Sequence, residues 1–574
     1  MSEPKSDLRW TVLHSRTLYG FAALSIFAVS WRSRANINPD GISYLDLSRE
    51  MLKANASAYF HPYWSPLLPA LIAMVQKIAS PKPNSILLLA HAVITASALA
   101  GLVAFIHLVD EWRRLLATRG RKELTRGQDF SLSLFGLVLL LSAVTGFLGT
   151  DNISPDMLVL ALVFAIAGTS CRLANGRGRA GSAFWLGLFL ALGYFTKAAL
   201  FPLALLFLMA SAISWLKNRT LVKHLLIASL VFTALAAPYI AILSVREHKV
   251  TFGESGRLSY AWLVLHNSPS FAGWTQGSQD SGYPAHPLRV SGTNPTILQF
   301  DNTVQGTLPI WYNPVYFYDG LKAPFDLKLQ IKQVLRSPSQ VLKNTTKITA
   351  VALAVPALLF VLGRRRGQRS RFAAPWLIAW AFGAYFMYSL IELLPRFVGS
   401  FFVIIVFVGA SEFLTRIPEV SIRLGNLTLC IGALLLTGLV ASRSARRFVS
   451  PESNGTLQQL TADDLQRLGV LPRGRLAVVG DPFNVYFAFR DNLRVVATIG
   501  FRGGDIPADT DKFWSMDNKS QTALEDRLAN VGVTAIISSS SCTASGSGWV
   551  PIGNNEYCAL LIGGGQRKSQ AARP

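Results

Sequence analysis

The sequence is short of charged residues and of cysteine. Only 15% of its 574 residues are charged, against about 25% in a typical soluble domain. The four cysteines form neither a Cys-x-x-Cys pair nor a Cys/His spacing that binds zinc. These shortages argue against an ordinary soluble enzyme and against a cysteine-based metal or redox centre.

Acidic residues are also scarcer than basic ones, with 32 Asp and Glu against 55 Lys and Arg. In a soluble protein this excess would indicate binding to nucleic acid. Here the basic residues are concentrated in short runs between apolar segments, and 51% of the chain is hydrophobic. The excess therefore indicates membrane topology, and we expect membrane lipid and no nucleic acid as a partner.

Long apolar runs are what the sequence has in abundance, and roughly 20 apolar residues suffice for a helix to cross a bilayer. The run at 181–216 would extend about 54 Å as a single helix, so we expect two spans with a turn near Lys197. Residues 1–16 are basic and lack a cleavage site, which predicts an uncleaved first span. The expected apolar segments are 17–31, 84–109, 130–149, 157–171, 181–216, 225–244, 347–363, 373–391, 397–415 and 425–441.

The basic loops predict the orientation, because short loops rich in Lys and Arg stay in the cytoplasm. The clusters lie at 113–126, 172–179, 217–223 and 364–371. All of them can be cytoplasmic only if there are eleven spans and the Pro-broken run at 64–79 lies at the interface without crossing. The N-terminus is then cytoplasmic and the tail outside, although Arg443, Arg446 and Arg447 oppose this arrangement.

We therefore predict an all-α polytopic membrane domain over residues 1–444, followed by a small α/β extracytoplasmic domain over 445–574. The outer loops of the membrane domain are expected at 32–83 and 245–345. Cys542 and Cys558 both fall in the outer domain, where oxidation can occur, so we expect them to be close in space. The tail alternates β-rich runs at 476–480, 493–499, 533–538 and 558–562 with a helical stretch around 518–530.

Carboxylates stand where two outer loops meet the spans. Asp40, in Asn38-Pro39-Asp40-Gly41, begins the first outer loop, and Asp151 and Asp156 occupy a short loop between two spans. The simplest alternative for each is helix capping, since Asp is common at helix starts.

Two cations are expected on the same side. Lys197 and Arg396 each lie at a turn between apolar spans, where a charge is costly unless it snorkels to the interface or meets an anion. Together they would suit a phosphate headgroup. His61 also faces outward beside Tyr63 and Trp64, among aromatic residues that either belong to an interfacial belt or stack on sugars.

These residues resemble the GT-C membrane glycosyltransferases, especially family 39, which includes protein O-mannosyltransferases and aminoarabinose transferases. Asp40, Tyr44 and Arg49 resemble the opening of the family's first outer loop, although Gly41 stands where its second acid is usual. The resemblance covers most of residues 10–415. The other similar motifs are Pro155-Asp156, Gly193-Tyr194-Phe195-Thr196-Lys197 and Pro395-Arg396-Phe397.

The resemblance implies transfer of a hexose or pentose from a polyprenyl-phosphate donor to an unknown acceptor, outside the bacterial cytoplasmic (inner) membrane. Asp40 would be the general base, and Lys197 and Arg396 would stabilise the departing phosphate. Asp156, with Asp151, would bind the acceptor or a divalent cation. Tyr44 and His61 would complete the substrate-binding set. No residue is assigned as a metal ligand, and a divalent cation is the one cofactor left open.

Two other functions remain open at this stage. A transporter or flippase would carry charges near mid-bilayer, whereas the charges singled out here lie at span ends. A non-catalytic glycolipid-binding protein is also compatible with Gly41 in place of the second acid.

Overall fold

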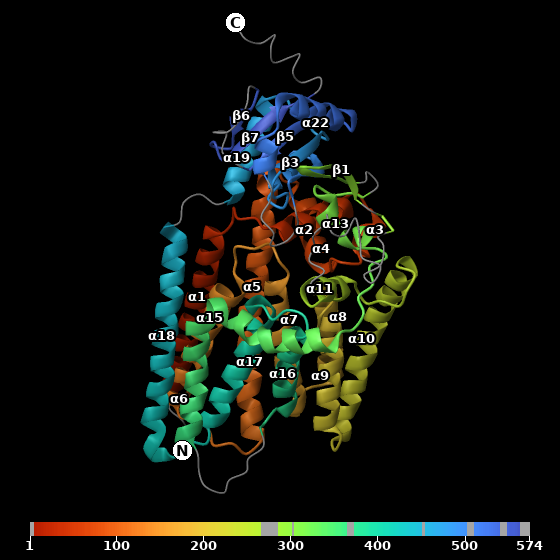
Figure 1. Cartoon of the computed structure of the whole chain (residues 1–574). Helices are drawn as coiled ribbons and strands as arrows, with labels where there is room; N and C mark the ends of the chain where they lie inside the picture. Colours follow the sequence, from red (N-terminus) through yellow and green to blue (C-terminus); the bar gives the residue numbers. More distant parts are fainter. Residues whose placement is uncertain are drawn as a thin grey trace.

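The computed structural model describes residues 5–265, 285–286, 288–300, 304–363, 372–449, 454–501, 510–539 and 548–562. It consists of a helical bundle with an α/β cap at one end (Figure 1). Helix α1 (Lys5–Arg32) starts at the end of the bundle opposite to the cap. The predicted outline, a helical membrane domain with a small C-terminal sheet domain, is confirmed.

Within the described residues, seven helical segments are long and apolar enough to cross a membrane. Three shorter apolar helices accompany them, so the count of about eleven spans remains a prediction. The run at 181–216 is divided into two helices at Lys197, as predicted. The main helices of the bundle are α5 (Ile86–Thr118), α6 (Arg126–Ala143), α7 (Asp156–Ala174), α8 (Ala180–Thr196), α9 (Leu200–Trp215), α10 (Arg219–Arg246), α15 (Leu327–Gly363), α16 (Pro375–Ser389), α17 (Pro395–Leu414) and α18 (Ile422–Val449).

Small residues let the central helices approach closely. A Cβ atom on Gly168 of α7 would lie 2.7 Å from His107 Cδ2 and 3.1 Å from the backbone of Leu108 on α5. A Cβ atom on Gly101 of α5 would lie 3.0 Å from Leu160. Glycine at helix contacts is typical of membrane bundles, where association depends on close packing rather than on a hydrophobic driving force.

The outer connections form a layer between bundle and cap. Helix α2 (Pro39–Leu52) follows α1, and α3 (Ala56–Tyr59) and α4 (Leu67–Ala79) lie beside it below the cap (Figure 1). Helix α4 lies in the run at 64–79 and packs against α2 and α5. The later outer loop contributes α11 (Ser255–Leu263), α13 (Pro309–Tyr312) and α14 (Pro314–Phe317).

The cap is a mixed seven-stranded sheet in the order β1-β2-β4-β3-β5-β7-β6. Its central strand β3 pairs in parallel with β4 and β5, and every predicted β-rich run of the tail forms a strand. The sheet also reaches beyond 445–574, because β1 and β2 come from the outer loop and β2 pairs with β4. Its elements are β1 (Arg289–Thr293), β2 (Thr296–Gln299), α19 (Asn454–Arg467), β3 (Arg475–Val479), α20 (Tyr486–Arg490), β4 (Arg494–Ile499), α21 (Asp511–Trp514), α22 (Asn518–Asn530), β5 (Val533–Ser538), β6 (Val550–Ile552) and β7 (Tyr557–Leu561).

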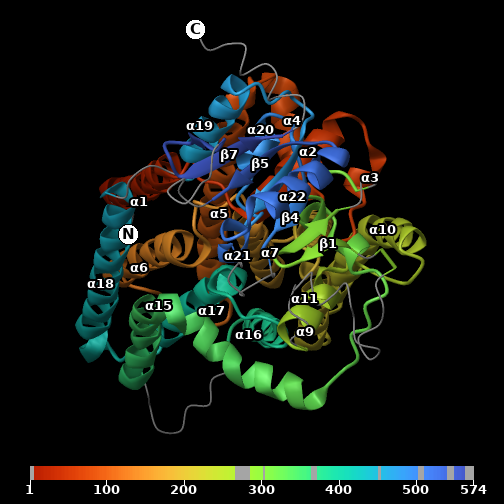
Figure 2. The same cartoon turned by 45° about the horizontal axis from the view of Figure 1, so that its top comes forward.

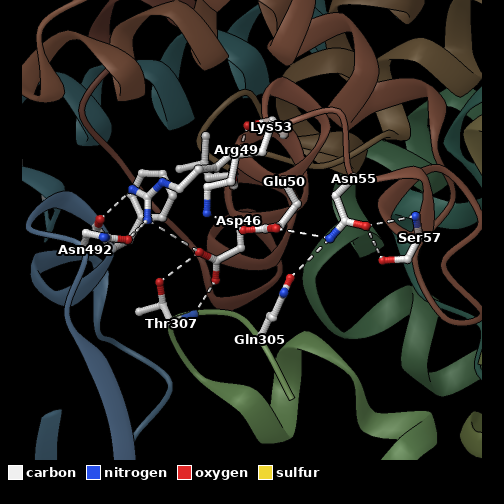
Figure 3. A network of polar contacts seen from close by, with 12 residues as sticks. Asp46, Arg49, Glu50, Lys53, Asn55, Ser57, Gln305, Thr307 and Asn492 are labelled. Atoms are coloured by element: carbon white, nitrogen blue, oxygen red, sulfur yellow. Dashed lines mark hydrogen bonds and ion pairs between the residues drawn. The ribbon is translucent and has the colours of Figure 1, made fainter. Parts of the chain in front are cut away.

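Polar contacts of α2 fasten this layer to the cap. Figure 3 shows the buried Asp46 carboxylate, which accepts hydrogen bonds from the Thr307 backbone N–H at 2.7 Å and from its hydroxyl at 2.9 Å. Arg49 donates to the Phe489 carbonyl at 2.7 Å and to Asn492 at 3.2 Å. Helix α2 is therefore held between the outer loop and the cap.

Arg443, which opposed the predicted orientation, lies within α18 rather than in a loop. Its guanidinium donates a hydrogen bond of 3.1 Å to the Gly146 carbonyl, in the π-helical turn Val144–Leu148. A basic residue held by the protein in this way is a weaker topology signal than a residue in a free loop.

The cysteines differ in state. Cys171 and Cys430 carry free thiols, whereas Cys558, buried in β7, is disulfide-bonded. Cys542 lies outside the described residues, so its proximity to Cys558 remains a prediction.

Candidate active site

A cavity of about 320 Å³ opens where the outer layer meets the bundle. The starts of α2, α7 and α17, the turn between α8 and α9, the start of α11 and the end of α16 contribute to it. Predicted site residues that line it are Asp40, Tyr44, Asp156, Lys197 and Arg396. Three helix starts and one turn, all distant in sequence, thus bring the two acids and the two cations to one place.

Asp40 forms an ion pair with Arg396 on the wall of the cavity. Its Oδ2 atom lies 3.6 Å from Arg396 Nη2. Asp40 is in the first turn of α2, whereas the N-cap is Asn38, and no side-chain cap hydrogen bond is present there. The capping alternative therefore does not describe Asp40.

The neighbours of Asp40 join the first and second outer loops. The Asn38 side chain accepts a hydrogen bond of 2.9 Å from the Ile153 backbone N–H. A Cβ atom on Gly41 would lie 2.7 Å from Asn38 Oδ1 and 3.0 Å from Ile153 Cβ. Glycine is thus required at 41 by the close approach of the two loops, and a second acid would not fit there without a shift.

Asp156 and Lys197 form the second ion pair. Lys197 Nζ lies 2.9 Å from Asp156 Oδ1, and the Ser154 hydroxyl donates to Asp156 Oδ2 at 3.1 Å. The same ammonium lies 3.7 Å from the ring centroid of Phe397, the neighbour of Arg396. Lys197 therefore meets an anion and an aromatic face inside the protein instead of snorkelling.

Burial shifts the pKa values of two residues that line the cavity, Lys197 and Tyr44. The two shifts have opposite directions. Burial lowers the pKa of Lys197. The nearby Asp156 carboxylate opposes this effect, and the positive charge of Arg396 reinforces it. Burial raises the pKa of Tyr44 well above its usual range, and the negative charge of Asp40 acts in the same direction. Tyr44 therefore stays a neutral phenol that can donate a hydrogen bond into the cavity.

His61 does not line the cavity but shapes it. Its Nδ1 accepts hydrogen bonds of 3.2 Å from the backbone N–H groups of Tyr63 and Trp64, both of which do line the cavity. Burial, together with the Arg246 charge, lowers the pKa of His61 to about 3. His61 is therefore neutral in the folded protein, and its hydrogen bonds support the aromatic side chains that line the cavity.

Asp151 also lies away from the cavity lining. It packs against the turn at Gly149, where a Cβ atom would meet Asp151 Oδ1 at 2.5 Å. Of the two acids in this loop, only Asp156 reaches the cavity.

The cavity lining also includes residues that were not predicted as site residues, among them Tyr63, Trp64 and Glu392. Tyr63 and Trp64 belong to the aromatic segment that begins at His61, and a turn after Pro62 is the signal that could have selected them. Glu392 precedes the Pro395-Arg396 motif, but a single acid at a span end carries no specific signal.

Within the described part of the chain, no three His, Cys, Asp or Glu side chains come together as ligands for a metal ion. The Asp156 and Asp40 carboxylates instead pair with Lys197 and Arg396, respectively.

Neither a family model nor a curated protein sequence matches this chain. Its fold is similar to that of ArnT from Cupriavidus metallidurans bound to undecaprenyl phosphate, with a TM-score of 0.51 and 12% identity over 95% of this chain and 97% of that one. It is also similar to the apo oligosaccharyltransferase of Archaeoglobus fulgidus, with a TM-score of 0.51 and 12% identity over 92% of this chain and 69% of that one. The predicted resemblance to the GT-C glycosyltransferases is confirmed at the level of the fold.

Proposed function

We propose that this protein is a membrane glycosyltransferase that moves a sugar from a polyprenyl-phosphate donor to an acceptor hydroxyl at the cavity. The observation that carries the proposal is the pair of opposed ion pairs, Asp40 with Arg396 and Asp156 with Lys197, on the wall of one cavity. A glycosyl transfer needs a base for the acceptor and positive charge for the leaving phosphate. Both requirements are met within this wall.

In the proposed reaction, the Asp40 carboxylate takes the proton of the acceptor hydroxyl while the acceptor oxygen attacks the anomeric carbon. The bond between that carbon and the phosphate oxygen breaks, and its electron pair leaves with the polyprenyl phosphate. Arg396 and Lys197 face the growing negative charge, and the guanidinium offers the bidentate geometry that phosphate prefers. Asp156 keeps Lys197 in place and charged, since it opposes the effect of burial on the ammonium.

The choice of donor is supported by the position of the cavity and by the fold. The cations lie at the outer ends of apolar helices, where a phosphate on a lipid tail would be presented. The similar ArnT structure holds undecaprenyl phosphate. We further propose that the chain belongs to the bacterial cytoplasmic membrane, with the cap outside.

The direct test is transfer of label from a radiolabelled polyprenyl-phosphate sugar, with membranes from cells with and without the protein. The proposal expects label in an acceptor fraction only when the protein is present. An Arg396→Gln variant should lose this transfer, whereas Asp526→Asn, which alters an exposed carboxylate on α22, should keep it. Label that crosses the membrane while still attached to the lipid would instead identify a flippase.

A further inference from the structure

The first half of α15 differs from the rest of the bundle in direction. The helix begins across the outside of α16 and then turns to run along α18, as Figures 1 and 2 both show. Only its second part, Thr345–Gly363, is apolar enough to cross a membrane. Pro338 lies inside the helix, and proline is the usual cause of a bend because it removes a backbone hydrogen bond. Residues 327–343 therefore lie at the level where this span leaves the apolar layer.

One stripe of this segment is apolar and uncovered. Leu327, Ile331 and Leu335 recur every four residues and so share one face of the helix. Their side chains are exposed by 62%, 52% and 75%, respectively. In water such a stripe would be costly, whereas an interfacial helix buries it in the upper acyl chains.

A basic stripe runs beside the apolar one. Lys328, Lys332 and Arg336 also recur every four residues, one position after each apolar residue, and all are exposed. Basic residues that border an apolar stripe are typical of helices that lie on anionic lipid headgroups.

The opposite face of the segment forms hydrogen bonds to the turn at the end of α16. This set of contacts is called the grip. Gln330 Nε2 donates to the Leu390 carbonyl at 2.7 Å, and Gln333 Nε2 donates to the Ile391 carbonyl at 2.6 Å. The Ser337 hydroxyl lies 2.9 Å from the Ser389 carbonyl oxygen and shares its single proton between this oxygen and the Gln333 carbonyl of its own helix. Carbonyls at a helix end lack partners within the helix, so these side chains supply the hydrogen bonds that α16 cannot.

The gripped turn leads directly into the candidate active site. Ile391 and Glu392 line the cavity, and Arg396 follows on the first turn of α17. Gln340 adds a contact, since its side chain accepts a hydrogen bond of 3.3 Å from the Leu393 backbone N–H. Fixing this turn fixes the backbone from which Arg396 reaches Asp40.

We propose that residues 327–343 lie on the surface of the outer leaflet and act as a positioning device for Arg396. The apolar and basic stripes bind the acyl chains and anionic headgroups of the bilayer. The face that carries Gln330, Gln333 and Ser337 holds the turn at 389–393 at the depth in the bilayer at which a lipid phosphate would lie. Only the statement about Arg396 and the donor rests on the proposed function; the membrane contact and the grip on the turn do not.

The membrane contact is tested with a fluorophore on the full-length protein in lipid nanodiscs, after Cys171→Ala and Cys430→Ala. A label at Leu335→Cys should be quenched about twofold or more by nitroxides on acyl chains, relative to a label at Arg336→Cys in the neighbouring basic stripe, which would lie among the headgroups. Equal quenching at the two positions would overturn the proposed surface.

The grip is tested by backbone hydrogen exchange over residues 389–397. In Gln333→Leu the freed Ile391 carbonyl should loosen the turn, so exchange should be about tenfold faster than in the wild type. Ser339→Ala, on an exposed position of the same helix, is the matched control. If Gln333→Leu does not fold, Ser337→Ala is the milder variant, and unchanged exchange in the folded variant refutes the grip.

Binding of undecaprenyl phosphate then tests the positioning of Arg396. Gln333→Leu should weaken the affinity about tenfold, and the Ser339→Ala control should not. If the wild type binds the lipid and Gln333→Leu binds it equally well, the positioning role is refuted while the proposed function stands. If the wild type does not bind it at all, the proposed function fails, and the quenching and exchange results still decide the surface and the grip.

Discussion

Lys197 Nζ lies 2.9 Å from Asp156 Oδ1, although 41 residues separate them in the chain. The lysine occupies the turn between α8 and α9, and the aspartate is the first residue of α7. Both side chains are largely buried at the wall of the cavity that also holds Asp40 and Arg396. The pair therefore joins the start of α7 to the turn between α8 and α9 and positions one of the two cations.

Removing one partner of this pair should destabilise the protein more than removing both. Asp156→Asn leaves the Lys197 ammonium in a site where burial already disfavours its charge, so we expect a loss of about 3 kcal/mol in the free energy of unfolding. The double variant Asp156→Asn with Lys197→Met should recover part of this loss. Thermal unfolding of the purified proteins in detergent measures the cycle, and additive losses would show that the two residues are not coupled.

The four charged residues of the cavity could be expected to lie close together, because each stands at the end of an apolar run on one side of the membrane. They are Asp40, Asp156, Lys197 and Arg396. Sidedness needs only parity and the positive-inside rule, which are readable from composition. The roles of these residues remain predictions, since geometry alone does not measure turnover.

Other features could not be read from the sequence because they depend on tertiary contacts. Strands β1 and β2 are short, and β2 becomes a sheet strand through its pairing with β4, almost two hundred positions away. The burial of His61 is likewise set by neighbours distant in sequence, among them Tyr312 and Arg246. The local sequence Phe60-His61-Pro62 does not distinguish a buried structural histidine from one that binds a substrate.

His61 should make the protein sensitive to acid. Its pKa is about 3 in the folded protein and 6.5 in the unfolded chain, so between these values only the unfolded chain binds the proton. The free energy of unfolding should therefore fall by about 1.4 kcal/mol for each pH unit below roughly 6.5. Unfolding measured from pH 7 to pH 5 should show a shallower slope for His61→Asn.

The exposed His248 provides the control for this experiment. Its backbone has a positive φ of 53°, which asparagine tolerates, so His248→Asn should fold normally. If the pH dependence of the free energy of unfolding persisted in His61→Asn and disappeared in His248→Asn, the effect would belong to His248 and the prediction would be wrong.

Arg49 should couple α2 to the cap. Its guanidinium carbon lies 3.8 Å from the centroid of the Phe489 ring, in addition to the hydrogen bond to the Phe489 carbonyl. Arg49→Ala should lower the free energy of unfolding by about 2 kcal/mol and speed proteolysis within the cap. Lys53→Ala, which removes a more exposed ion pair of the same helix, should have little effect, and equal effects of the two variants would contradict the coupling.

The predicted topology of about eleven spans can be tested by reporters that are active in one compartment only. Fusions after residue 125 should report the cytoplasm, and fusions after residues 270 and 570 should report the outside. The reason is that all four basic clusters are cytoplasmic in this topology, and Arg443 lies within α18, hydrogen-bonded to Gly146, rather than in a loop. Residue 125 outside, or residue 570 inside, would end this topology.

Asp40→Asn should separate catalysis from binding. The amide keeps the shape of the carboxylate and cannot accept the proton, so turnover should fall by about a hundredfold or more while expression stays intact. Loss of the negative charge 3.6 Å from Arg396 leaves the guanidinium free for phosphate, so the affinity for the donor should stay the same or rise. Initial rates at saturating donor, together with a binding isotherm for the polyprenyl-phosphate sugar, measure the two effects.

This combination distinguishes a base from a structural acid. If Asp40 only oriented Arg396, then Asp40→Asn would misplace the guanidinium, and the affinity for the donor would fall together with turnover. If Asp40 were a solvated loop carboxylate, both quantities would match those of Asp526→Asn. A hundredfold loss of turnover with undiminished donor affinity is expected for a group that acts in the transition state, as a general base does, and for neither of the two alternatives, because the missing interaction is then formed in the transition state and not in the ground state.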